Sequence, residues 1–183
     1  MSRIKRLVQS YGNYIAVPWR SDAAAAQRVV FCVYHETEEL RLRAKVDEFE
    51  IATRAAGHEW ALFDLTDSFP NWLASQRYAK SYFQKPNLLS TLLPKYLGYI
   101  EAEFDAFLQD KNVSDDFVVA LQGVGSLFGF LKVKEVVDKL APKVKGRLLV
   151  FFPGSYEDNN YRLLDGYDGW NYLAVPITAD KEF

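Results

Sequence analysis

The side chains best suited to chemistry follow the apolar runs of this sequence. Asp64 and Asp67 come at the end of the run Trp60–Leu65, a place where α/β enzymes often hold carboxylates that bind Mg²⁺ or act as bases. Carboxylates at such a position also cap helices, because their oxygens accept the free N–H groups of a first turn. No partner motif accompanies the two residues, so the capping interpretation is favoured.

A glycine-rich turn follows the run Phe117–Leu121 and contains Gly123, Gly125 and Ser126. Glycines allow backbone N–H groups to approach an anion, which predicts a phosphate loop as one alternative. A P-loop, however, ends in Gly-Lys-Ser/Thr, and the glycine spacing does not match a dinucleotide fingerprint either. A packing turn is therefore the favoured interpretation.

The remaining reactive residue types stand alone. His35 and His58 have no metal-binding spacing, and neither Ser126 nor Ser155 lies in a Gly-x-Ser-x-Gly motif. A single cysteine, Cys32, excludes an internal disulfide and a cysteine-based zinc site. The sequence therefore predicts no catalytic residue, no metal and no cofactor.

Basic residues gather near the carboxyl end of an otherwise slightly acidic chain of net charge −2. The net charge gives no general attraction to DNA or to anionic membranes. Local contact with DNA phosphates is expected to be weak at most, since such lysines are usually the solvated face of a helix. The residues that would make it are Lys132, Lys134, Lys139, Lys143, Lys145 and Arg147.

Apolar runs alternate with helical patterns along the 183 residues, which predicts a single three-layer α/β domain with a mainly parallel sheet flanked by helices. We expect an amino-terminal helix and connector over 1–27 and a sheet core over 28–183. The predicted strands are Val29–Tyr34, Trp60–Leu65, Phe117–Leu121, Leu148–Phe152 and Tyr172–Ile177. In such folds a site forms where the carboxyl ends of the strands meet.

Helix signals lie between these strands. Ser2 is a predicted cap for a first helix that ends at Gly12, and its apolar stripe packs either on this domain or on another protein. The pattern over 36–56 predicts one helix capped by Gly57. Pro70 suits the first turn of a helix that carries Trp72, Leu73 and Tyr82. A later helix breaks or kinks at Pro94.

The segment 153–171 is predicted to be a long ordered loop, because it holds many large rings. These rings either pack inward or form an aromatic anchor for a partner, and the two alternatives are evenly balanced. The candidate partner-binding residues are Tyr156, Glu157, Asp158, Tyr161, Arg162, Asp168 and Trp170, with Ile4, Leu7 and Tyr11 of the first helix.

The carboxyl-terminal stretch 147–177 also resembles the BrxB family of bacterial BREX phage-defence systems. The likeness is carried by RLLVFFPG at 147–154, NNYRLLD at 159–165 and DGWNYLAVPI at 168–177, with DLTD at 64–67 and GVGSLFG at 123–129. The resemblance implies a component that acts beside an adenine-specific DNA methyltransferase, a large ATPase and PglZ, a protein of the alkaline-phosphatase superfamily. It brings no catalytic residues.

Two functions follow as expectations. The first is a non-catalytic adaptor that binds other BREX proteins, PglZ first, and supports host DNA methylation and phage restriction. The second is a nucleotide- or metal-dependent enzyme, or a phosphate-binding module, that uses Asp64, Asp67 and the turn at 123–129. With no signal-peptide pattern and no apolar run near 20 residues, the protein is expected to be cytoplasmic and without a membrane segment.

Overall fold

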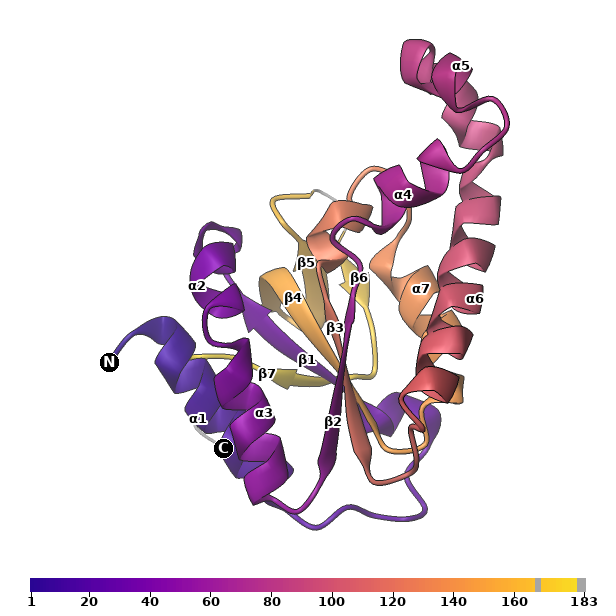
Figure 1. Cartoon of the computed structure of the whole chain (residues 1–183). Helices are drawn as coiled ribbons and strands as arrows, with labels where there is room; N and C mark the ends of the chain where they lie inside the picture. The colour runs from indigo at the N-terminus through magenta and orange to yellow at the C-terminus, as the bar shows by residue number, and fades with distance from the viewer. Residues whose placement is uncertain (167–168, 181–183) are drawn as a thin grey trace.

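The computed structural model describes residues 1–166 and 169–180, and a sheet lies at its centre. Parallel strands run in the order β2-β3-β4-β1-β7 (Figure 1). Their bounds are β1 Val29–Tyr34, β2 Glu59–Asp64, β3 Phe117–Gln122, β4 Arg147–Glu157 and β7 Val175–Ile177. The predicted strands are thus confirmed, although the last is shorter than expected.

The sheet is mixed, because an antiparallel part continues from β4. Strand β5 (Asn160–Leu163) pairs with β4 in antiparallel register, and β6 (Trp170–Asn171) pairs with β5. The α/β class with flanking helices is confirmed, whereas a parallel arrangement holds only for the other five strands.

Alternating side chains of the central strands build two cores, one on each face of the sheet. Phe31 faces the core shared with α6 (Leu93–Asp110) and α7 (Val133–Leu140). Cys32 faces the core shared with α1 (Arg3–Ile15) and α3 (Val46–Ala55). Figure 1 shows these two helix layers on opposite sides of the strands.

Helix α1 packs its apolar stripe against one face of the sheet, beside α3. Its apolar stripe, Ile4, Leu7 and Tyr11, is at most 2% exposed, and the Tyr11 hydroxyl lies 2.7 Å from Thr53 Oγ1 of α3. Ser2 caps the helix as predicted, accepting from the backbone N–H of Lys5 at 3.2 Å. The helix continues past Gly12 to Ile15, so the predicted end at Gly12 is wrong.

The predicted helix over 36–56 is divided into three pieces. A short 3₁₀ turn, η2 (Glu36–Glu38), leads into α2 (Glu39–Arg43), and α3 follows after a break at Lys45, whose ψ of 5° is not helical. Gly57, with φ +87°, ends α3 as predicted. The break lets α2 lie over the carboxyl ends of the strands while α3 lies on the sheet (Figure 1).

Three short elements lie between β2 and α6; the first buries Trp72 and Leu73 in the core, and the other two extend from the body of the molecule (Figure 1). They are α4 (Ser68–Ala74), α5 (Ala79–Gln84) and η3 (Pro86–Thr91). Pro70 lies in the first turn of α4 and Pro94 in the first turn of α6. Because α4 ends at Ala74, Tyr82 does not continue the helix of Trp72, contrary to expectation.

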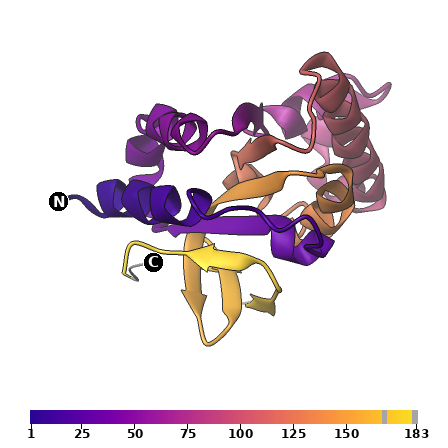
Figure 2. The ribbon, with the colours of Figure 1, turned by 90° about the horizontal axis from the view of Figure 1, so that it is seen from below.

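The segment expected as a loop over 153–171 is largely a β-hairpin, a correction to the sequence analysis. Strand β4 runs through Pro153 to Glu157 and turns at Asp158 and Asn159, whose φ values are 50° and 65°. Residues with positive φ at both central positions match the right-handed twist of a hairpin. Figure 2 shows the hairpin extending away from the rest of the sheet.

The remaining short turns lie at strand ends. They are η1 (Ala25–Arg28) before β1, η4 (Val124–Leu127) after β3 and η5 (Ala141–Lys143) after α7. The last follows directly on α7, which ends at Leu140, two residues before Pro142. Within the described ranges no helix is both long enough and apolar enough to span a membrane.

Candidate functional site

A crevice of about 270 Å³ lies where the carboxyl ends of the parallel strands meet. Of the expected strand-end residues, Gly123, Gly125 and Ser126 line it, whereas Asp64 and Asp67 line a separate hollow of about 230 Å³. Loops from four different strands contribute to the crevice. Its walls are formed by Glu36, Glu39, Arg43, Thr66, Gly123, Gly125, Ser126, Pro153 and Leu164. The polar side chains of this crevice are the candidates for any chemistry at the strand ends.

Asp64 is engaged in hydrogen bonds within the protein. Its Oδ1 accepts from the backbone N–H of Thr66 at 2.9 Å and from the Thr66 hydroxyl at 2.5 Å. Its Oδ2 accepts from Gln122 Nε2 at 3.2 Å. Asp67 precedes α4 at the N-cap position without a side-chain capping bond. Asp64 therefore stabilises the turn after β2 and ties it to β3.

The cation of the crevice is neutralised by a neighbouring carboxylate. Arg43 Nε donates to Glu39 Oε1 at 2.8 Å, and Arg43 Nη2 donates to Thr66 Oγ1, also at 2.8 Å. The Tyr34 hydroxyl donates to the other oxygen of Glu39. Burial, followed by the hydrogen bond to Glu39, raises the pKa of Tyr34 above its ordinary value. A chain of hydrogen bonds thus links β1, α2 and the turn after β2.

The glycine-rich turn packs against this chain. Gly123 has φ +81°, and a Cβ atom there would lie 2.6 Å from the backbone nitrogen of Thr66. The Ser126 hydroxyl donates to Gly123 O at 2.6 Å and lies 3.0 Å from Leu65 O, so it is directed at backbone carbonyls. Val124 and Leu127 are buried. These contacts favour the packing interpretation of the turn.

The other candidate groups have separate local partners. His35 Nδ1 accepts from the backbone N–H of Thr37 at 3.2 Å, and His58 Nδ1 lies 2.9 Å from Asp116 Oδ1 at the opposite end of β2. Cys32 is fully buried in β1, and burial raises its pKa. Across residues 1–166 and 169–180, no three His, Cys, Asp or Glu side chains gather as metal ligands.

The second candidate region is the aromatic cluster below the hairpin. Tyr161 is fully buried, its hydroxyl donates to Ala174 O at 3.1 Å, and its ring centroid lies 4.7 Å from that of Phe31. Trp170 and Tyr156 are half-buried, with ring centroids 5.4 and 4.7 Å from Tyr161. Tyr161 therefore belongs to the core, and only the other two rings keep surface area for a partner.

An apolar pocket of about 540 Å³ opens beside these rings. One wall is the segment before α7, where Phe128 is 48% exposed, and the opposite wall comes from β5, β6 and the residues next to them. Its described lining is Phe128, Gly129, Leu131, Lys132, Val133, Lys134, Leu163, Asp165, Gly166, Gly169 and Trp170. An aromatic or aliphatic side chain of a partner could enter it.

Charged residues surround this hairpin. Glu157, Asp158 and Arg162 are exposed, as a rim around an interface would require. Asp168, the fourth charged candidate, lies outside the described residues. Ile4, Leu7 and Tyr11 lie in the core on the opposite face of the sheet and cannot contact a partner at the same time.

One comparison with known proteins identifies the family. The model of the family described as BREX protein BrxB matches residues 73–176, more than half of the chain. The chain belongs to the BrxB family. The match includes α5, α6, β3, β4 and the hairpin, and it confirms the resemblance noted in the sequence. It also links the protein to BREX defence. No curated protein and no solved structure matched this chain.

In this BrxB protein the fold engages three of the six residues of the expected basic patch, whereas Lys132, Lys139 and Lys145 are exposed. Arg147 is buried, its guanidinium carbon 4.6 Å from the centroid of the Trp19 ring, so it cannot reach DNA. Burial lowers the pKa of Arg147. Lys143 Nζ lies 2.8 Å from Asp105 Oδ1, and Lys134 Nζ lies 2.7 Å from Asp138 Oδ2.

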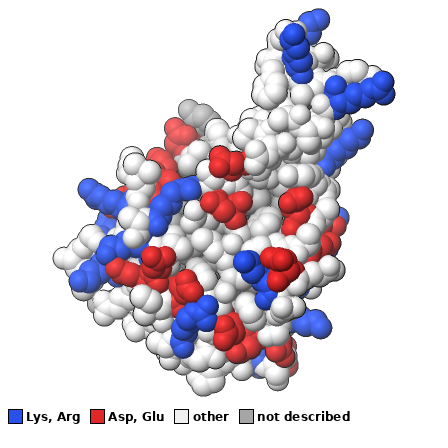
Figure 3. Space-filling view, viewed as in Figure 1, with Lys and Arg blue, Asp and Glu red and all other residues white. Residues whose placement is uncertain are grey.

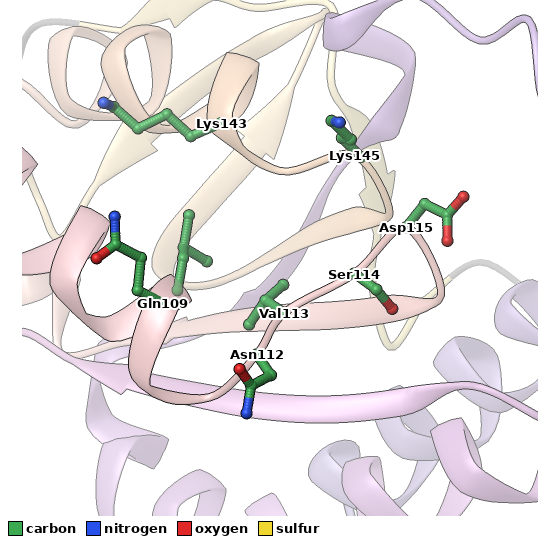
Figure 4. Close-up of a pocket in the computed structure, with 8 residues that line it drawn as sticks. Gln109, Asn112, Val113, Ser114, Asp115, Lys143 and Lys145 are labelled. Atoms are coloured by element: carbon green, nitrogen blue, oxygen red, sulfur yellow. The ribbon is translucent and has the colours of Figure 1, made fainter.

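A hollow of about 710 Å³ lies at the opposite, amino-terminal edge of the strands (Figure 4). It is lined by the turn between α6 and β3 together with Lys143 and Lys145. In Figure 4 the polar ends of Lys143, Lys145 and Asn112 point in different directions. The hollow therefore presents no convergent set of ligands.

Sequence reasoning missed a surface of this BrxB protein that carries large exposed side chains. In α5 and η3 no residue is buried, and Tyr78, Phe83 and Leu88 are 58%, 60% and 43% exposed. The signal was present in the sequence as three rings and four basic residues without a carboxylate between residues 75 and 95. We call residues 75–95 the arm.

Proposed function

We propose that this protein is a non-catalytic adaptor of a BREX system and that PglZ is its first partner. The observation that carries the proposal is the apolar pocket between Phe128 and Trp170. Membership of the BrxB family supports a role in BREX defence. The pocket, with its exposed ring and charged rim, supplies a surface through which such a role can be exercised.

The strand ends support a role without catalysis. Arg43 donates to Glu39 and to the Thr66 hydroxyl, and that hydroxyl donates to Asp64. The Ser126 hydroxyl is directed at backbone carbonyls. A nucleophile needs a base within hydrogen-bonding reach, and a bound nucleotide needs donors that are not already engaged. These groups instead hold α2 and the turns after β2 and β3 together.

The pocket has the composition of an interface centre. Leu131, Leu163 and Trp170 give apolar walls, while Lys132 and Asp165 stand at the edge with opposite charges. Interface hot spots lie in such desolvated pockets and are surrounded by a polar rim. An aromatic or aliphatic side chain of PglZ would enter here, and the hairpin charges would orient it.

Contacts of this kind would let the protein support host DNA methylation and phage restriction without acting on DNA itself. We place this activity in the cytoplasm, where the methylated host DNA is found. Other BREX proteins would be recruited through the same assembly.

The experiment is co-purification of PglZ with the tagged chain, using the variant Phe128→Ser. Loss of a hot-spot side chain removes at least about 2 kcal/mol of binding free energy, which corresponds to roughly 30-fold weaker association. The melting temperature should stay near that of the wild type, because Phe128 is 48% exposed. Leu40→Ser is the matched control, because Leu40 is an 82% exposed apolar residue of α2.

Retention of PglZ by Phe128→Ser at wild-type affinity would reject the pocket as the docking site. If Phe128→Ser and Leu40→Ser lose PglZ binding equally, the loss reflects a general effect of replacing an exposed apolar side chain by a polar one. If the wild-type chain does not bind purified PglZ at all, the choice of partner is wrong.

A further inference from the structure

The arm combines positive charge with a complete lack of carboxylates. Arg77, Lys80, Lys85 and Lys95 lie in it, and no Asp or Glu occurs between residues 68 and 100. The whole chain has net charge −2, so the rest of the protein carries −6 once these four charges are set apart. The charge of the molecule is therefore strongly divided between arm and body.

All four cations of the arm are exposed, and among the residues that the structure describes none of them has a carboxylate oxygen within 4.0 Å. In Figure 3 the protruding part carries blue side chains and no red ones, whereas red and blue are mixed over the body. Unpaired cations on a projecting element attract a polyanion at long range.

Exposed rings lie between these cations. Tyr78 and Phe83 are 58% and 60% exposed, and the guanidinium carbon of Arg77 lies 5.5 Å from the centroid of the Tyr78 ring. Aromatic rings and arginine planes are the surfaces on which unpaired bases stack, and each such stack contributes about 1–3 kcal/mol. Bases in a duplex are already stacked on one another and cannot use these rings.

Neutral hydrogen-bond donors complete the arm. Ser81, Gln84, Asn87 and Ser90 are exposed in α5 and η3. Hydroxyl and amide groups of this kind bind phosphate oxygens without adding negative charge. An arm built to meet an acidic protein would need apolar area and cations, but it would have no need to avoid every carboxylate over 33 residues.

We propose that the arm binds a single-stranded polynucleotide, with its cations on the phosphates and Tyr78 and Phe83 stacked on bases. The inference does not depend on the adaptor function, because the arm and the apolar pocket have no residue in common. It also differs from the contact expected at the patch around Arg147, in which the fold buries Arg147 and pairs Lys134 and Lys143 with carboxylates. Binding is weak and independent of sequence, since no base edge is read.

Fluorescence anisotropy of the full chain with a labelled 20-nucleotide strand tests the proposal, with DNA, RNA and a 20-base-pair duplex as separate probes. Four phosphate contacts predict a slope of about −3 in log affinity against log salt, or roughly 50-fold weaker binding at 200 mM than at 50 mM. The single strands should bind at least tenfold tighter than the duplex.

Two variants separate charge from stacking. The triple variant Arg77→Gln, Lys80→Gln, Lys85→Gln should reduce the salt slope to about −1. The double variant Tyr78→Ala, Phe83→Ala should weaken single-strand binding by about 30-fold and keep the slope, since stacking is lost but phosphate contacts remain.

The matched control is Lys132→Gln, Lys139→Gln, Lys145→Gln, which removes the same charge from the body and should bind like the wild type. Weakening by this control as large as that of the arm variant would place the binding elsewhere and overturn the proposal. Preference for the duplex, or no binding of any probe at 50 mM salt, would also overturn it.

Discussion

Tyr161 connects the hairpin to the central sheet through both its ring and its hydroxyl. The ring contacts Phe31 and Phe152 at centroid distances of 4.7 and 5.8 Å, and the hydroxyl donates to Ala174 O. We expect Tyr161→Ala to lower the free energy of unfolding by about 3–5 kcal/mol, the usual range for removing a buried ring. Tyr161→Phe loses only the hydrogen bond, about 1 kcal/mol. Urea denaturation measures both, and a wild-type midpoint for Tyr161→Ala would contradict the core assignment.

The wild type and Tyr161→Phe should also differ in how their free energy of unfolding depends on pH. Burial raises the pKa of the Tyr161 hydroxyl, so the folded protein keeps a proton that the unfolded chain loses above pH ~10. The stabilisation is complete below that pH and is lost as the pH rises above it, by up to about 1.4 kcal/mol per pH unit. Between pH 10 and 11, Tyr161→Phe should therefore lose stability less steeply than the wild type. Parallel curves would exclude a contribution from this hydroxyl.

At the residue scale, local signals were predictable and long-range ones were not. Ser2 and Gly57 act within one turn of their own helices, and the sequence shows both. Whether a ring of the segment 153–171 faces inward depends on the course of β4 and β5, which brings Tyr161 onto Phe31 from 130 residues away. Arg147 was counted as a surface cation for the same reason: its burial depends on Trp19.

At the element scale, the turn of the hairpin requires an unusual backbone. Asp158 is exposed and has φ 50°, a conformation that Gly and Asn adopt readily and that a β-branched residue opposes by roughly 1–2 kcal/mol. We expect Asp158→Val to lower the free energy of unfolding by that amount, whereas Asp158→Gly should stay close to the wild type. Thermal unfolding of the two variants compares them, and equal melting temperatures would contradict the turn geometry.

The strands of the parallel part were predictable because both of their faces are buried, which leaves an uninterrupted apolar run. The hairpin was not, because Pro153 and Gly154 ordinarily end a strand. Here Pro153 joins the hairpin through its carbonyl, which accepts the Leu164 N–H at 2.8 Å. Gly154 has no Cβ atom and therefore gives the carbonyl of Arg162 room to approach. Similarly, a periodic pattern over 36–56 could not show the break at Lys45, which lets α2 reach the strand ends.

At the scale of the whole molecule, two cores share one sheet, and the arm contacts only one of them, through Tyr82, Leu89 and Leu92. Phe31 and Cys32, adjacent in β1, face the two cores, so unfolding one face removes the support of the other. We propose that residues 1–183 form one domain on this ground. The two short elements of the arm, α5 and η3, have no buried residue and therefore lack this mutual support.

This difference predicts where the folded protein opens first. Segments with few buried contacts unfold locally at a free energy well below that of global unfolding, and proteases cut the opened form. Arg77 and Lys80 are exposed in the arm, so limited trypsin digestion should cut after these two residues before any site in the sheet. Mass spectrometry of the first fragments locates the cut, and first cleavage within 29–64 or 117–157 would contradict the division into arm and body. A single-stranded oligonucleotide at low salt should slow cleavage after Arg77 and Lys80, whereas PglZ seated on the apolar pocket should leave it unchanged.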